Sequence, residues 1–170
     1  VDNGDGTGYW PDYNQLTGAS AAVAALVESG KMSDPAYRAQ IDKGIAFIKS
    51  KVKSNGGIYE QYNEAYETGM ALVALSLYGQ ATTTDAAHRT IVQNAVNFLK
   101  SYQNIEGSVR GGDYGPNGEA TTTNPDGCGA SYKAYYGAWG YYPGDNNTNK
   151  CEGGGDLSNT QFVVMGLWYG

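Results

Sequence analysis

Two kinds of hydrophobic pattern alternate along this chain. Nearly every position is apolar between residues 19 and 27, and again between 70 and 77, which predicts helices buried on all sides. Each of these stretches is followed by a segment whose apolar residues recur every three or four positions, which predicts a helix with one buried face. The two stripes are Tyr37, Ile41, Ile45, Ile48 and Val52, and then His88, Val92, Val96, Leu99 and Gln103.

The pattern predicts helices over about residues 14–29, 64–79 and 86–103, another beginning at about residue 35, and a fifth beginning near residue 156. Asp34 and Asp85 stand where the second and fourth would begin, and Asp is a favoured N-cap. Gly30 follows the first, as glycine often does at a helix end. Buried and one-sided helices alternate, so the fifth helix should also be buried on all sides. This alternation predicts an all-α fold with the fully apolar helices inside and the one-sided helices outside.

The chain also repeats itself with an offset of 51 residues. The matched pairs include Thr17/Thr68, Gly18/Gly69, Asp34/Asp85, Ala36/Ala87, Arg38/Arg89 and Phe47/Phe98. A partial third copy, residues 160–170, aligns with residues 68–78. Such a repeat indicates α-hairpins that bury their inner helices only against their neighbours.

A single domain over residues 1–170 is therefore expected, with repeats over about 1–53, 54–103 and 137–170 and an insertion over about 108–136. The first residues resemble the middle of a motif, and residue 170 falls where a helix should continue. We therefore expect the chain to be a piece of a longer one.

Charge and composition argue against some classes of partner and indicate where the protein is located. The net charge of −6 argues against nucleic acid or an anionic membrane as partner. No apolar run reaches about 18 residues, so no transmembrane segment is expected. Cys128 and Cys151 suit a disulfide, which predicts an extracellular or periplasmic location, although two independent buried thiols are the alternative.

The loops that precede the three apolar helices concentrate aromatic residues. These loops would open at one end of the inner layer, where aromatic rings could contact a hydrophobic or carbohydrate ligand. The candidate ligand-binding residues are Tyr9, Trp10, Tyr59, Tyr62, Trp139 and Tyr141.

Three segments carry a family resemblance. They are GDGTGYW at 4–10, GGIYEQYNEAYETGMALVAL at 56–75, and GAWGYYPG followed by GDLSNTQFVVMGL within 137–167. With their outer helices they resemble the α/α-toroid repeats of squalene cyclases and protein prenyltransferase β subunits, and most of all the secreted bacterial branch called the prenyltransferase/squalene oxidase repeat. The resemblance implies an α/α toroid, of which this chain would form about half a ring. It leaves the chemistry open, because one fold hosts many functions.

The catalytic motifs of the family are incomplete in this chain. Squalene cyclases use an Asp-x-Asp-Asp acid segment, which does not occur here. Asp126-Gly127-Cys128 has the Asp-x-Cys form of the prenyltransferase zinc site, but the family's later His aligns with Asn159. The single histidine, His88, lies on an outer helix and suits a packing role. Zinc needs three or four ligands, and only two can be named.

Calcium is the other metal considered. Asp145, Asn147, Asn149 and Asp156 fall at positions 1, 3, 5 and 12 of a calcium-loop spacing. Lys150 replaces the glycine expected at position 6, so a solvated polar turn is the alternative.

We expect a binding or assembly module without catalysis of its own, with no cofactor apart from this weak calcium candidate. Self-association, or a second protein, would cover the apolar edge of the incomplete ring. The alternatives are a terpenoid cyclase or prenyltransferase-type enzyme with catalytic residues outside this stretch, and a polysaccharide lyase on a similar toroid, for which Arg110 is the candidate base.

Overall fold

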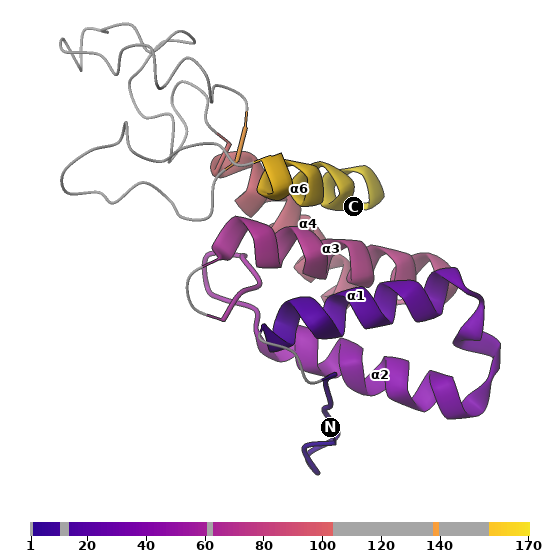
Figure 1. Ribbon diagram of the computed structural model, residues 1–170. Helices are drawn as coiled ribbons and strands as arrows, with labels where there is room; N and C mark the ends of the chain where they lie inside the picture. Colours follow the sequence, from indigo (N-terminus) through magenta and orange to yellow (C-terminus); the bar gives the residue numbers. More distant parts are fainter. Residues whose placement is uncertain (1, 11–13, 61–62, 104–137, 140–156) are drawn as a thin grey trace, which may run out of the picture.

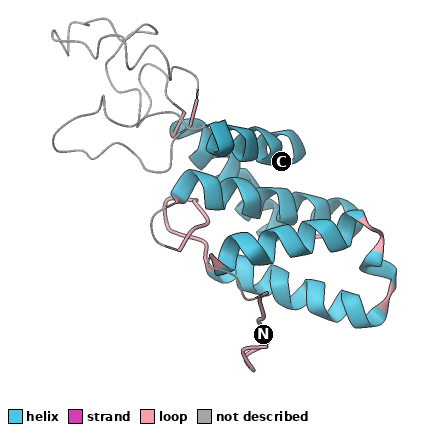
Figure 2. Cartoon of the chain, viewed as in Figure 1, coloured by secondary structure: helices cyan, strands magenta, loops and turns pink. Residues whose placement is uncertain are grey.

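The computed structural model describes residues 2–10, 14–60, 63–103, 138–139 and 157–170. These residues form five α-helices, a short 3₁₀ turn over Lys31–Ser33 and no strand (Figures 1 and 2). The α-helices are α1 (Gln15–Glu28), α2 (Pro35–Ser50), α3 (Glu64–Ala81), α4 (Ala86–Ser101) and α6 (Leu157–Tyr169). The prediction of an all-α chain is confirmed for these residues. None of their helices combines the length and hydropathy needed to cross a membrane.

Local capping explains where the helices begin. The Asn14 side chain accepts a hydrogen bond from the Thr17 N–H at the start of α1. Asp34 and Asp85 do the same for α2 and α4, so both predicted N-caps are confirmed. Gly30 follows Ser29, the C-cap of α1, and has a φ of 74°. This left-handed backbone conformation costs glycine little free energy.

The helices form two layers. The inner layer is a row in which α3 lies between α1 and α6 and contacts both (Figure 1). The other two helices pack from outside, α2 chiefly on α1 and α4 chiefly on α3. Neighbouring helices in the chain thus form two hairpins, and α3 has helices around it on every side.

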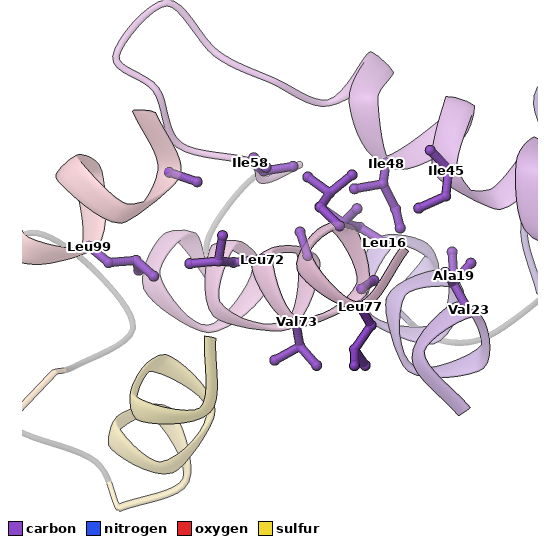
Figure 3. Close-up of a cluster of buried hydrophobic side chains, with 14 of the residues drawn as sticks. Leu16, Ala19, Val23, Ile45, Ile48, Ile58, Leu72, Val73, Leu77 and Leu99 are labelled. Carbon is purple, nitrogen blue, oxygen red and sulfur yellow. The ribbon is translucent and has the colours of Figure 1, made fainter. Parts of the chain in front are cut away.

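The core is centred on α3. Its side chains are buried all round from Ala71 to Leu77, as the continuous apolar run predicts. Figure 3 shows Leu72 and Val73 pointing to different sides of the helix, with Leu16 and Ile48 from the first hairpin and Leu99 from α4 nearby. Buried apolar surface stabilises a fold by about 25 cal/mol per Å², and α3 has more buried residues than any other described helix.

The other two apolar helices correct the sequence prediction. Burial on all sides is wrong for α1, where Ala21 and Ala25 are exposed. It is wrong for α6 as well, where Leu157, Val164 and Trp168 are exposed. Both helices lie at the ends of the row, so each has an inner-layer neighbour on one side only among the described residues.

Two glycines bring α3 and α6 into backbone contact. A Cβ placed on Gly69 would lie 2.9 Å from the Phe162 carbonyl oxygen, and one placed on Gly166 would lie 2.7 Å from the Gly69 carbonyl oxygen. No larger residue fits at either position without moving a helix. Beside this crossing, the rings of Tyr66 and Phe162 meet edge to face at 4.9 Å.

Candidate functional site

The loops before α1 and α3 share one local structure. A backbone bond from residue 3 to 7 (3.0 Å) recurs between residues 53 and 57 (2.8 Å). An Asx-type bond to the N–H two residues on also recurs, at 2.9 Å in the first loop and 3.0 Å in the second. The residues in these contacts are Asn3, Asp5 and Thr7 in the first loop and Lys53, Asn55 and Gly57 in the second. The equivalent residues of the two loops lie 50 positions apart, one fewer than the offset of 51 that relates the helices, and they make the same local hydrogen bonds.

Two of the predicted aromatic residues fix these loops to the outer helices. The Tyr9 ring lies 5.2 Å from the ring of Phe47 on α2. The Tyr59 ring lies 5.9 Å from the ring of Phe98 on α4. Phe47 and Phe98 are themselves a matched pair of the sequence repeat, so each loop docks on its own outer helix and the aromatics are spread along the row.

A threonine near the start of α3 and of α6 holds the preceding loop. The Thr68 hydroxyl accepts from the Ile58 N–H at 3.0 Å and donates to the Ile58 carbonyl at 3.2 Å. The Thr160 hydroxyl makes the same pair of bonds with Trp139, at 3.1 and 3.4 Å. Thr17, the counterpart in α1, has a buried hydroxyl with no hydrogen-bond partner among the described residues.

The two described tryptophans of the candidate set differ in exposure. Trp139 is only 4% exposed, and its indole N–H donates to the Leu99 carbonyl at 2.7 Å, so the structure gives it a packing role between loop and α4. Trp10 is partly buried against the core, beside Gly44 of α2.

Tyr9 and Trp10 line a cavity of about 210 Å³ on the outer side of the first hairpin. Its polar groups come from Asp2, Gln40 and Lys43, and Asp2 forms an ion pair with Lys43. The hydrogen bond from Lys43 lowers the pKa of the exposed Asp2 carboxyl. Aromatic surface beside an amide and charged groups suits a small polar ligand, so the ligand-binding prediction stays a prediction for these two aromatics.

The N-terminal ends of α1 and α3 meet around a buried carboxylate. Glu67 is 2% exposed, and its two oxygens accept from the Asn14 side-chain amide and from the Glu60 N–H, both at 2.6 Å. Its negative charge also lies in the first turn of α3, where the helix dipole favours it. The bond to Asn14 joins residues 53 positions apart, so no local pattern in the sequence indicates it.

Other predicted site residues lie outside the described residues. They are the aromatics Tyr62 and Tyr141, the calcium candidates Asp145, Asn147, Asn149 and Asp156, and the cysteines Cys128 and Cys151. The calcium site and the disulfide therefore stay predictions. Within the described ranges, no three His, Cys, Asp or Glu side chains gather as a metal site.

The outer face of α6 is the largest apolar feature without a described neighbour. Leu157 is 90% exposed, Val164 52% and Trp168 85%, and spacings of seven and four residues place them on one side of the helix. Aligning Thr160 with Thr68 pairs these residues with Ala65, Leu72 and Ser76 of α3, all of which are buried. The equivalent side chains are thus buried on α3 and exposed on α6.

Comparison of the chain with family models, with curated proteins and with solved structures finds no match.

Proposed function

We propose that this chain is an extracellular α-hairpin repeat domain of the α/α-toroid type that serves assembly rather than catalysis. In this proposal, α6 receives a second copy of the chain, whose α1 continues the inner row. The observation that carries the proposal is the exposed apolar face of α6, whose counterpart on α3 is buried.

The recurring contacts support the repeat interpretation. Loops with equal hydrogen bonds precede α1 and α3, and equal threonine contacts hold the loops before α3 and α6. An inner row with outer helices packed on it is also what part of an α/α toroid would contain. Repeat units of this kind are stable only when each apolar face meets a neighbour.

A second copy suits the open face because the two ends of the row are complementary. Two exposed positions of α1, Ala21 and Ala25, are small, whereas the exposed apolar positions of α6 are large, with Trp168 among them. Large side chains packing on small ones allow close helix approach, as α6 already approaches α3 at Gly69. One copy has three inner helices, α1, α3 and α6, so two copies would together have six. If one copy forms about half a ring, as the resemblance implies, two copies would complete it.

Sedimentation equilibrium tests the proposal directly. The wild-type chain, 18.1 kDa as a monomer, is expected to sediment as a multiple of that mass. Trp168→Glu should shift the equilibrium to the monomer, because it places a charge in the proposed interface while changing a side chain that is exposed in the isolated fold.

The matched control is Tyr37→Glu, which changes an exposed aromatic on α2, far from the α6 face in sequence. It should leave the mass unchanged. A monomeric wild type at all concentrations, or equal dissociation by both variants, would contradict self-association through α6.

A further inference from the structure

The cavity beside the first loop is lined by side chains that a ligand can reach. It lies between residues 2–10 and α2, and its volume is about 210 Å³. Of its two charged side chains, Asp2 is 57% exposed and Lys43 is 40% exposed. Gln40 is exposed as well, and Trp10 is exposed in part. Polar groups and an aromatic ring are therefore both open to solvent at this place.

The second repeat shows the equivalent place with different side chains. The loops match with an offset of 50 and the outer helices with an offset of 51, so Gly8 corresponds to Ile58 and Gln40 to Ile91. Ile58 is fully buried, and Ile91 packs against the core. The first repeat thus has a glycine and an amide where the second repeat has two apolar side chains.

The aromatic ring of this cavity is also particular to the first repeat. Trp10 corresponds to Glu60, and Gly44 of α2 corresponds to Ala95 of α4. A Cβ placed on Gly44 would lie 3.2 Å from Cζ3 of Trp10, so this glycine leaves room for the ring. The second loop makes its tyrosine–phenylalanine contact with its outer helix without any of these residues. They are therefore not needed to dock a loop, and they point to a role of the first loop alone.

The polar groups around Trp10 suit hydroxyl groups. The Asp2 carboxylate accepts from the Gly4 N–H at 3.0 Å and from Lys43, and it has lone pairs left for further donors. The Gln40 amide can both donate and accept. A sugar ring presents a C–H face that packs on an aromatic ring and hydroxyls at its edge that bond to such groups.

The charges and the size of the cavity limit the ligand further. Asp2 and Lys43 form an ion pair, so the charges of the lining cancel, and an ion of either sign would compete with a partner already in place. A neutral hydroxyl can bond to either member without separating the pair. The volume is below the roughly 300–1,000 Å³ of pockets for drug-sized ligands, which limits the ligand to about one ring.

We propose that this cavity binds one neutral sugar ring. The C–H face of the sugar packs on Trp10, and its hydroxyls bond to the Asp2 carboxylate and to the Gln40 amide. Lys43 donates to a further sugar oxygen while it stays paired with Asp2.

The indole N–H signals of the three tryptophans provide an NMR readout. Trp139 should exchange slowly with solvent, because it is buried and bonded to the Leu99 carbonyl, and Trp168→Phe identifies the signal of Trp168. The remaining signal belongs to Trp10. Methyl glucoside, methyl galactoside and methyl mannoside serve as probes. At least one of them should shift the Trp10 signal saturably at millimolar concentration and leave the other two signals unchanged.

Control compounds test the stacking and the neutrality separately. Glycerol has hydroxyls but no ring face, so it should give no saturable shift. Glucuronate and glucosamine each carry a charge that is repelled by one member of the Asp2–Lys43 pair, so both should bind more weakly than the neutral glycoside.

Gln40→Ala is the decisive variant. Gln40 is exposed on α2 and Ala is a good helix former, so the chain should stay folded. Affinity for the glycoside should fall about threefold to tenfold. Gln40→Ile, which introduces the residue of the second repeat, should lower it at least as much. Gln93→Ala is the matched control, because Gln93 is an exposed glutamine on α4 outside the lining.

Three results would overturn the proposal. They are the absence of a saturable Trp10 shift with every glycoside, binding of glycerol or a charged analogue as tight as that of the glycosides, and unchanged affinity in Gln40→Ala. The lining residues come from the first loop and α2, so failure here is distinct from failure of the assembly proposal at α6.

Discussion

Helices α3 and α6 carry the same opening motif but have different surroundings. A threonine near the start of each binds the preceding loop through the same two hydrogen bonds. From Ala71 to Leu77, α3 is buried on all sides, whereas α6 exposes Leu157 in its first turn and Val164 and Trp168 further along. The difference shows that apolar composition alone does not bury a helix. Which of its side chains are buried depends on the helices that pack beside it.

Shortening one pair of equivalent side chains, one in α3 and one in α6, should give the largest difference in stability. Leu72→Ala should destabilise the fold by about 2–5 kcal/mol, because Leu72 is fully buried in α3. Val164→Ala, at the equivalent position of α6, should change the stability of the monomer by less than about 0.5 kcal/mol. Urea unfolding of both variants at low protein concentration measures this, and equal losses would contradict the contrast.

The contact between the two helices can be broken at its glycines. Gly166→Ala should destabilise the fold by about 1–3 kcal/mol, because the new Cβ would meet the Gly69 carbonyl oxygen. Gln161→Ala, an exposed change on the same helix, is the control and should be nearly neutral. Thermal unfolding separates the two, and a neutral Gly166→Ala would mean that α6 packs differently.

The threonine contacts can be compared near the starts of α1, α3 and α6. Thr68→Val should cost about 1–3 kcal/mol, because it leaves the buried N–H of Ile58 without its acceptor. Thr17→Val should be neutral or stabilising, because its buried hydroxyl has no described partner. Chemical unfolding measures both variants. If Thr17→Val lowers the free energy of unfolding as much as Thr68→Val does, the Thr17 hydroxyl must also bind a backbone group, which would contradict the difference between α1 and α3.

The smallest expected effect concerns pH. The folded-state pKa of His88 lies below its ordinary value of about 6.5, chiefly because the ring is buried. The charges of Lys49 and Arg89 also lower this pKa, whereas the hydrogen bond to Leu75 and the charge of Asp85 raise it. The unfolded chain therefore binds the proton more readily, and stability is complete above pH 6.5 and declines as the pH falls towards the folded-state pKa. His88→Gln should flatten this part of the stability profile, and an unchanged slope would exclude His88 as its source.

The sequence was sufficient to predict where helices begin, but not which helices pack beside one another. Helices α2 and α4 begin at Asp34 and Asp85 as expected, since capping depends on residues a few positions apart. Burial on all sides was predicted for three helices and holds only for α3, because composition shows what a helix can bury and not what lies beside it.

The candidate site shows the same limit. The repeat pairs Phe47 with Phe98, but only the structure shows that these rings receive Tyr9 and Tyr59. The bond between Asn14 and Glu67 spans the two hairpins and leaves no local signal. His88 was assigned to packing, and its burial and its bond to Leu75 agree with that. No pattern in the sequence indicates that its Nδ1 is buried without a partner among the described residues.

Hydroxyl-radical labelling at increasing protein concentration is the most direct test of whether the α6 face receives a second copy. Met165 and Trp168 on α6 and Tyr37 on α2 are all exposed in the monomer, so each reports on its own surface. We predict that labelling of Met165 and Trp168 falls as the protein associates, while labelling of Tyr37 stays constant. Constant labelling of Trp168 across a range in which the mass increases would show that the copies meet elsewhere and would contradict the account.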